Sequence, residues 1–213
     1  DLTLPNGATN GGLSGISCLP VSGCVAVGFA AQSTTYAGML VTEVAGQWTA
    51  STTSLGDTST SFQAVSCLTS NVCEFSGQSQ SAGVTTGLVG TEDGGVVDFA
   101  AVSPPSGTTG GVVNAISCAT SCTGLLTVNR LGGSPYAPMA ASISGSTIGT
   151  AITLAVPSDI GISGDGNLLA VHCPSVSHCV GLGVYRAADL SFDLYAQTFT
   201  GHDAGTAVQV ATS

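Results

Sequence analysis

A short hairpin with a cysteine on each side of its turn recurs four times along the chain. The first copy reads GISCLPVSGCVAVG over residues 15–28, and the last reads AVHCPSVSHCVGLG over residues 170–183. The hairpins recur about every 50 residues, a period typical of proteins in which each repeat is one small group of strands. Repetition favours pairing of the cysteines within each turn, which gives the disulfides Cys18–Cys24, Cys67–Cys73, Cys118–Cys122 and Cys173–Cys179.

A second marker keeps the same phase as the cysteines. A glycine in a short turn follows each pair at a nearly constant distance, at Gly46, Gly94, Gly145 and Gly201. Between these markers apolar and polar residues alternate with period two, which indicates strands, and no helical period is sustained. In the first unit the pattern predicts strands over residues 13–18, 24–31, 37–45 and 47–54.

Four antiparallel strands in about 50 residues are the size of one β-propeller blade. We therefore predict an all-β, four-bladed propeller in a single domain, 1–213, with repeats at 11–57, 60–105, 110–157 and 166–213. The segment before the first repeat resembles the joint at 101–115, so the two ends would meet if the four blades form a ring. An open array continued by another copy and a β-sandwich of the same hairpins are the alternatives.

The composition limits the compartment and the partners. An even number of cysteines at regular spacing favours structural disulfides in an extracellular or cell-surface protein, and five intervening residues fit zinc poorly. The chain is 7% charged, has no lysine and carries a net charge of −10. A chain without a basic patch is a poor partner for nucleic acid or an anionic membrane surface. No apolar run approaches the length of a membrane span, and we predict no metal and no cofactor.

The hairpins resemble a family of secreted bacterial repeat proteins, often found in actinobacteria. Their units read roughly SCP-S-x-x-x-C-x-A-V-G, and the segments ISCLPVSGCVAVG and VHCPSVSHCVGLG match this pattern best. The resemblance implies an exported, propeller-like protein and transfers no catalytic residue. The third unit departs from the pattern with a shortened cysteine pair. In the fourth unit His172 takes the place that Ser17, Ser66 and Ser117 hold in the other three.

The rim of the third and fourth units carries the candidate ligand site. Both arginines fall at the end of the second strand of their units, opposite the face expected to hold the cysteine turns. Guanidinium, carboxylate and aromatic groups together suit a sugar or a peptide carboxylate. The candidate residues are Arg130, Tyr136, Asp165, Tyr185, Arg186, Asp189 and Asp193. Two other interpretations remain open: the arginines pair with nearby aspartates, or Asp165 belongs to a small calcium loop.

Enzyme chemistry finds little support in the residues. Two arginines are too few for a sialidase-type site, and a glycosidase needs two carboxylates facing one sugar. Glu92 and Asp93 are adjacent but fall at a turn on the other face, and Glu43 and Glu74 are isolated. We therefore predict no enzyme but a binding or adhesion module for a glycan or another cell-surface component. The alternative is a structural subunit that assembles with copies of itself into a filament, sheath or surface layer, and a glycan hydrolase is third.

The scarcity of charge predicts tolerance of acid. Near pH 2 the carboxylates are protonated, and the remaining cations are two arginines, three histidines and the amino terminus. Repulsion between like charges, a main cause of acid unfolding, is then weak. We expect the circular dichroism spectrum of the folded protein to persist down to about pH 2. Unfolding that begins above about pH 4 in such a titration would contradict this prediction.

Overall fold

Every regular element of the described chain is a β-strand. The computed structural model describes residues 3–5, 7–19, 23–56, 59–69, 71–103, 108–130, 137–161, 166–175, 177–200 and 203–210. Within these ranges the all-β prediction is confirmed, and no helix long and apolar enough to cross a bilayer occurs there.

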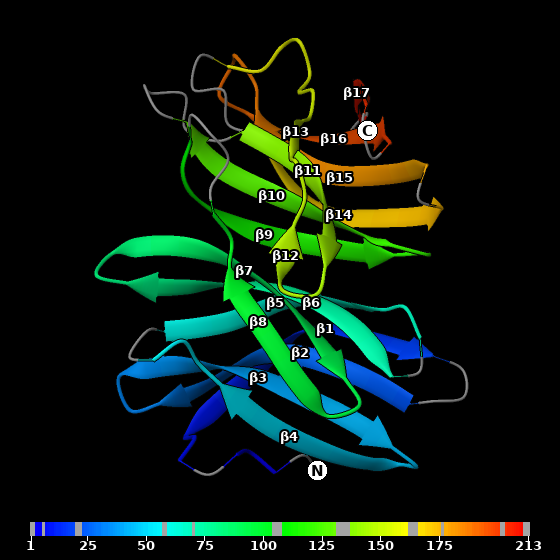
Figure 1. Cartoon of the computed structure of the whole chain (residues 1–213). Coiled ribbons are helices and arrows are strands. Elements are labelled where there is room, and N and C mark those ends of the chain that lie inside the picture. The colour runs from blue at the N-terminus through cyan, green and yellow to red at the C-terminus, as the bar shows by residue number, and fades with distance from the viewer. Residues whose placement is uncertain are drawn as a thin grey trace.

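The strands follow one another as antiparallel meanders, one for each repeat unit (Figure 1). The first unit contains β1 to β4, at Asn10–Leu19, Gly23–Gln32, Thr35–Val44 and Gln47–Thr53. The second contains β5 to β8, at Ser59–Cys67, Val72–Ser81, Val84–Asp93 and Val96–Ala101. The third contains β9 to β13, at Thr108–Cys118, Cys122–Arg130, Ala137–Ser144, Thr147–Ile148 and Ile152–Thr153. The fourth contains β14 to β17, at Gly166–Ser175, His178–Arg186, Phe192–Phe199 and Ala204–Gln209.

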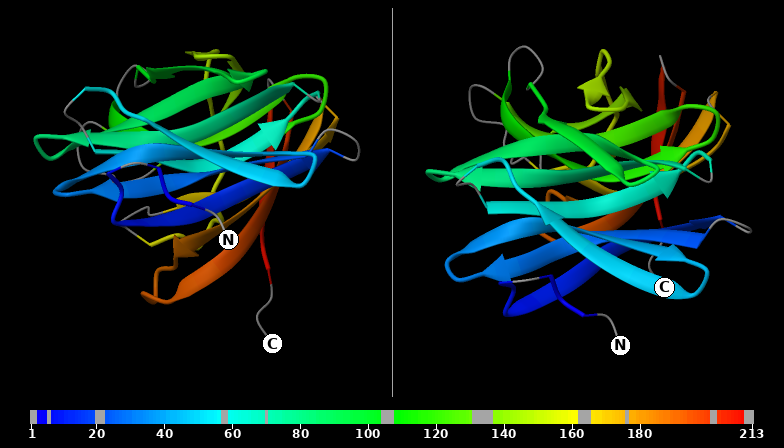
Figure 2. Two further views of the ribbon diagram at one scale, coloured as in Figure 1. Left: turned by 90° about the horizontal axis from the view of Figure 1, so that it is seen from below. Right: turned by 60° about the horizontal axis from the view of Figure 1, so that its bottom comes forward.

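The prediction of four separate blades closed into a ring is wrong. The described strands form three sheets, of four, nine and four strands. A parallel bridge between Thr86 of β7 and Gly111 of β9 joins the second and third units into the nine-stranded sheet. The first sheet lies at the bottom of Figure 1 and the last at the top, and no described strands of these two sheets pack closely. Figure 2 shows the same open arrangement from two further directions.

The core consists of successive apolar contacts between neighbouring units. The first strand of each later unit, β5, β9 or β14, packs on the sheet of the unit before it. Val27 and Leu40 of the first unit pack with Phe62 of the second. Val89 of the second unit packs with Ile116 of the third in the same way. Since one repeat unit cannot bury its apolar face alone, each unit depends on its neighbours.

A hydrogen bond recurs at each of these three contacts. The serine before the first cysteine of a unit accepts a hydrogen bond from the backbone N–H of the first cysteine of the next unit. The donor and acceptor atoms are 3.1 Å apart for Cys67 and Ser17, 3.0 Å for Cys118 and Ser66, and 2.9 Å for Cys173 and Ser117. Because it repeats with each apolar contact, this bond fixes the position of one unit on the next.

The predicted disulfides are confirmed. Each pair of cysteines closes the turn between the first two strands of its unit, as Cys18–Cys24, Cys67–Cys73, Cys118–Cys122 and Cys173–Cys179. The cysteines of each pair lie opposite or nearly opposite each other on adjacent antiparallel strands, so each bond closes its hairpin at the end of the ladder. Four disulfides are typical of proteins from an oxidising, extracellular environment.

The glycine four residues after the second cysteine is explained by an irregularity in the strand opposite. The register shifts between Phe62 and Ala64 of β5, which brings the β5 backbone close to Gly77 of β6. A Cβ atom on Gly77 would lie 2.2 Å from the carbonyl oxygen of Ser61. Gly28 and Gly183 meet the corresponding carbonyl oxygen of the first strand in their own units at 1.9 and 2.2 Å. Close approach of two backbones therefore requires glycine at this position in the first, second and fourth units, whereas the third unit has Leu126 there.

We expect Gly77→Ala to lower the free energy of unfolding by about 2–3 kcal/mol, because backbone atoms must move to admit the methyl group. Urea denaturation followed by circular dichroism measures the change. Gly181→Ala is the matched control, since its Cβ would first meet the end of the Leu168 side chain at 3.1 Å. Equal losses in the two variants would contradict the explanation.

Candidate functional site

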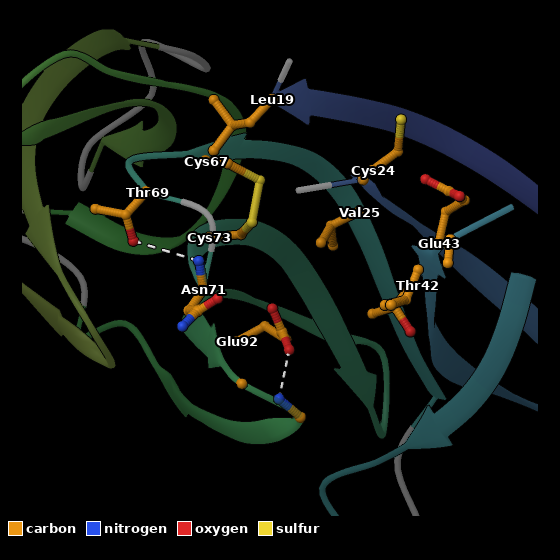
Figure 3. Close-up of a pocket in the computed structure, with 15 residues that line it drawn as sticks. Leu19, Cys24, Val25, Thr42, Glu43, Cys67, Thr69, Asn71, Cys73 and Glu92 are labelled. Carbon is orange, nitrogen blue, oxygen red and sulfur yellow. Dashed lines mark hydrogen bonds between the residues drawn. A yellow bond between two sulfur atoms is a disulfide. The ribbon is translucent and has the colours of Figure 1, made fainter. Parts of the chain in front are cut away.

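A cleft of about 810 Å³ lies between the first and second units, at the end of the sheets that carries the disulfides. Its lining comes from the β1–β2 hairpin, the β3–β4 turn, the β5–β6 hairpin and the β7–β8 turn. In these two units, the cysteine turns and the turns between the third and fourth strands therefore lie at the same end of the sheets. The lining residues are Leu19, Gly23, Cys24, Val25, Thr42, Glu43, Val44, Ala45, Cys67, Thr69, Asn71, Cys73, Glu92, Gly94 and Gly95 (Figure 3).

Two carboxylates belong to the walls of this cleft. Glu43 is at the end of β3 and Glu92 at the end of β7, and Figure 3 shows them on the two different units. One carboxylate oxygen of Glu92 accepts a hydrogen bond of 2.7 Å from the N–H of Gly95, and Glu43 accepts one from Gly46. Each glutamate thereby closes its own turn, and it keeps a second carboxylate oxygen for other partners.

The remaining lining is mixed in polarity and held by short hairpins. Thr42 and Asn71 add a hydroxyl and an amide, while Val25 and Leu19 add apolar surface. The Thr69 hydroxyl accepts hydrogen bonds from the backbone N–H groups of Asn71 and Val72, which holds the β5–β6 turn (Figure 3). Because the Cys67–Cys73 disulfide closes the same hairpin, this wall is preorganised.

The predicted rim of the fourth unit is a hydrogen-bonded cluster around Tyr185. The Tyr185 side chain is 1% exposed, and its hydroxyl donates to the carboxylate of Asp159 at 2.9 Å. Burial, this hydrogen bond and the charges of Asp159, Asp193 and Asp189 raise the pKa of Tyr185 to about 12. Tyr185 therefore anchors the segment before β14 to β15 and offers little surface to a ligand.

The other rim residues are partly gathered at the β15–β16 turn. Asp189 accepts hydrogen bonds from the Ser191 hydroxyl and N–H at 2.7 and 3.0 Å, which lower the pKa of its carboxyl. Asp193 accepts from Gln209 at 3.2 Å. The Nε atom of Arg186 is buried, and among the described residues it has no hydrogen-bond partner.

The structure does not describe the side chains of three candidate residues. Tyr136, Asp165 and the side chain of Arg130 lie outside the described residues, so the calcium interpretation of Asp165 stays a hypothesis. The strand ends agree with expectation, since β10 ends at Arg130 and β15 at Arg186. Within the described part of the chain, no group of three or more histidine, cysteine, aspartate or glutamate side chains is arranged to hold a metal ion.

The sequence predicts no relation between Glu43 and Glu92, and it predicts that Glu92 lies on the face opposite the ligand site. The structure places both in one cleft. A signal was present, because each glutamate precedes a turn glycine by three residues, at Gly46 and at Gly95. The same position in two adjacent repeats implies neighbouring places in space once the units stack.

A third glutamate, Glu74, is buried between the second and third units. It belongs to β6, and one of its carboxylate oxygens accepts a hydrogen bond of 2.9 Å from Gly145 in the turn after β11. The other oxygen is buried without a hydrogen-bond partner among the described residues. Burial raises the pKa of the Glu74 carboxyl, and the bond from Gly145 offsets part of this rise.

Comparison with solved structures finds a shared fold at low sequence identity. The chain is similar to a subtype N10 neuraminidase-like protein of A/little yellow-shouldered bat/Guatemala/060/2010, with a TM-score of 0.56 and 13% identity over 98% of this chain and 60% of that one. It is also similar to a structure of the GH130 family of mannoside phosphorylases, which contains glycoside hydrolases that target β-1,2 mannosidic linkages in Candida mannan, with a TM-score of 0.51 and 10% identity over 95% of this chain and 70% of that one.

These likenesses place the fold among propeller-like proteins. The chain spans about 60% of the length of the neuraminidase-like protein. No protein-family model and no curated protein matches the chain. The resemblance to secreted actinobacterial repeat proteins therefore stays a prediction.

The prediction that the protein is not an enzyme is contradicted by the same likenesses. It was based on the small number of arginines and on the absence of a carboxylate pair. The shared fold is one in which a family contains glycoside hydrolases. The prediction of no enzyme is therefore withdrawn.

We expect Glu74→Gln to raise the free energy of unfolding at pH 7 by about 1 kcal/mol or more, because a neutral amide costs less to bury than a carboxylate. The pKa of Glu74 is higher in the folded chain than in the unfolded chain, so protonation of Glu74 stabilises the folded state. This contribution is fully present below the unfolded pKa. The contribution is lost as the pH rises through the folded pKa. The difference in free energy of unfolding between Glu74→Gln and the wild type should therefore shrink toward pH 4. Urea denaturation at both pH values measures the gap.

The exposed carboxylate of Asp93 supplies the control, as Asp93→Asn removes one charge without burial. A Glu74→Gln variant less stable than wild type at pH 7 would contradict the assignment.

Proposed function

We propose that this protein recognises a neutral glycan outside the cell, in the cleft between its first and second units. The observation that carries the proposal is the meeting of two carboxylates, a threonine hydroxyl and an asparagine amide in one preorganised cleft. Glu43, Glu92, Thr42 and Asn71 supply these groups.

The chemistry of the cleft suits a sugar better than an apolar ligand. Ligand sites in proteins typically have volumes of about 300–1,000 Å³, in which a few polar groups fix the orientation. Carboxylate oxygens accept hydrogen bonds from sugar hydroxyls, and such charge-assisted bonds are stronger than neutral ones. Val25, Leu19 and Val44 offer apolar surface for the C–H face of a sugar ring.

The charge of the cleft favours a neutral glycan over an acidic one. The chain has no lysine, and its two arginines, Arg130 and Arg186, belong to the third and fourth units. A carboxylate of the ligand would therefore meet Glu43 and Glu92 without a nearby cation, which costs binding energy.

Hydrolysis of the glycan is the second candidate function. A pair of carboxylates on opposite sides of a glycosidic bond is the machinery of most glycoside hydrolases, with one as acid and the other as base or nucleophile. Glu43 and Glu92 are such a pair by residue type, and they come from two different units. The shared fold with a family that contains glycoside hydrolases adds support to this candidate.

Secretion and attachment at the cell surface belong to the same proposal. The four disulfides support an oxidising environment. Adhesion through the rim at Arg186, Asp189 and Asp193 stays a further prediction, because Tyr136, Asp165 and the side chain of Arg130 lie outside the described residues.

The proposal is tested by calorimetry and product analysis with two probes, β-1,2-linked mannan fragments and sialyllactose. We expect the neutral mannan fragments to bind and sialyllactose to bind at least about tenfold more weakly. Glu43→Gln and Glu92→Gln keep an oxygen for the turn hydrogen bond and should each weaken binding about tenfold. Release of shorter sugars by the wild type, lost in both variants, would favour the hydrolase.

Asp93→Asn serves as the control, because Asp93 follows Glu92 directly but does not line the cleft. Equal affinity of the wild type and both glutamine variants for mannan fragments would contradict the site. Tighter binding of sialyllactose would contradict the preference for neutral glycans.

A further inference from the structure

The boundary between the first and second units holds another cavity, at the end of the strands away from the disulfides. Its volume is about 230 Å³. The first unit contributes Phe29, near the end of β2, and Tyr36, at the start of β3. The second unit contributes the first residues of β5 and the last part of β6, through Ser59, Thr60, Ser61, Gln78 and Gln80. We call this cavity the Tyr36 pocket.

Two aromatic rings form the wall of the pocket that belongs to the first unit. The rings of Phe29 and Tyr36 meet edge to face, with their centroids 5.4 Å apart and their planes at 86°. Tyr36 is 51% exposed, so a ligand can reach its side chain. The backbone N–H of Tyr36 donates a hydrogen bond to the Ser59 hydroxyl at 3.3 Å, which ties this wall to the second unit. The two walls are therefore held in place before any ligand arrives.

Uncharged polar side chains form the wall that belongs to the second unit. In the antiparallel β5–β6 ladder, Ser59 pairs with Gln80 and Ser61 pairs with Gln78. Residues that pair directly, and residues two apart on one strand, lie on the same face of a sheet. The two hydroxyls and the two amides therefore form one group. Among the described residues the side-chain amides of Gln78 and Gln80 have no hydrogen-bond partner, so both are available to a ligand.

The corresponding space is closed at the boundary between the second and third units. Gly110 and Gly111 of the third unit take the positions that Ser59 and Thr60 hold in the second. Because glycine has no side chain, this part of β9 approaches β7 closely enough for the parallel bridge between Thr86 and Gly111. The cavity beside Gly110 and Gly111 measures about 10 Å³, which is about the space of one water molecule.

The boundary between the third and fourth units is filled at this end by a hydrogen-bond network. Thr127 takes the position of Phe29, five residues after the second cysteine, and Asn167 takes the position of Ser61. The Thr127 hydroxyl donates to the side-chain oxygen of Asn167 at 2.6 Å, and the Asn114 amide donates to the same oxygen at 2.8 Å. Within the described chain, an open pocket at this end is thus a feature of the first boundary.

We propose that the Tyr36 pocket binds a single uncharged sugar residue. The exposed ring of Tyr36 offers its negative face to the C–H groups of a sugar ring. A primary amide both donates and accepts hydrogen bonds, so Gln78 and Gln80 can pair with neighbouring sugar hydroxyls. The volume of the pocket lies below the about 300–1,000 Å³ of typical ligand sites, which suits one sugar ring rather than a longer glycan.

Other classes of ligand fit the pocket less well. None of its described lining residues carries a charge, so an ionic ligand would find no counter-ion among them. A wholly apolar ligand would bury the amides of Gln78 and Gln80 without partners, which costs binding energy. This proposal is independent of glycan recognition in the cleft, because the two sites lie at opposite ends of the strands and share no described lining residue.

The experiment is a titration of the ¹⁵N-labelled full chain with simple sugars, followed by NMR of its side-chain amide signals. The probes are methyl α-mannoside, methyl β-glucoside and methyl β-galactoside, each a single uncharged sugar residue. We expect at least one of them to shift the signals of Gln78 and Gln80, with a dissociation constant on the order of 1 mM. Absence of a shift at both glutamines with all three probes would overturn the proposal.

The same spectra separate this pocket from the cleft at the other end of the strands. The side-chain amide of Asn71 lines the cleft and reports binding there. Shifts of Gln78 and Gln80 support the pocket whether or not Asn71 shifts. Shifts confined to Asn71 would overturn the pocket and leave the cleft standing. Tighter binding of methyl β-glucuronide, which carries a carboxylate, than of all three neutral probes would overturn the choice of an uncharged sugar.

Substitutions test the contacts assigned to the sugar. Tyr36→Ala removes the ring and should weaken binding at least about fivefold, whereas Tyr36→Phe keeps the ring and should stay within about twofold of the wild type. Gln80→Ala, at an exposed position, should weaken binding about fivefold, with Gln78 as the reporter.

Trp48→Ala is the matched control, because Trp48 is an exposed aromatic residue of β4 that lines neither cavity. We expect this variant to bind as the wild type does. Equal losses in Tyr36→Ala and Trp48→Ala would overturn the assignment of the stacking ring. Unchanged binding in both Tyr36→Ala and Gln80→Ala would overturn the pocket itself.

Discussion

The structure depends on the packing of the first strand of each unit on the sheet of the unit before it. A single repeat unit leaves its apolar face exposed and must bury that face on a neighbour to offset the conformational entropy of ordering it. Phe62 between the first and second units and Leu168 between the third and fourth are fully buried by this contact. Stability in this chain is therefore a property of neighbouring pairs, as in other repeat proteins.

The disulfides stabilise single hairpins, whereas the contacts between units stabilise the stack. Each disulfide joins two strands of one hairpin and closes a short loop, which contributes about 2 kcal/mol on the chain-entropy model by restricting the unfolded chain. The serine hydrogen bonds, such as that from Cys67 to Ser17, join successive units. Because charged residues are scarce, ion pairs contribute little, and most of the described contacts between units are insensitive to pH. Glu74 is the exception, and its raised pKa favours the folded state in acid.

Much of the fold could be predicted because its signals are local. The cysteine spacing located four hairpins, and the alternation of apolar residues located the strands within them. The bridge between Thr86 and Gly111 could not be predicted, because it joins two units by a single residue pair that no pattern marks. Closure of the ring depends on the angle between units, which is set by side-chain volumes across each contact. The sequence predicts Tyr185 as a ligand-binding residue, whereas its side chain is buried against Asp159, a partner 26 residues away that no local pattern marks.

The cleft shows why a repeat protein can build a site from residues that look structural in each unit. Glu43 and Glu92 each close a turn, a role that one unit needs for itself. Stacking of the units brings the two turns to one cleft, so both glutamates line the same cavity. The third and fourth units have Ile143 and Phe199 at this position, and the pair of carboxylates arises between the first and second units alone. The cleft is therefore a property of one boundary between units and not of the repeat itself.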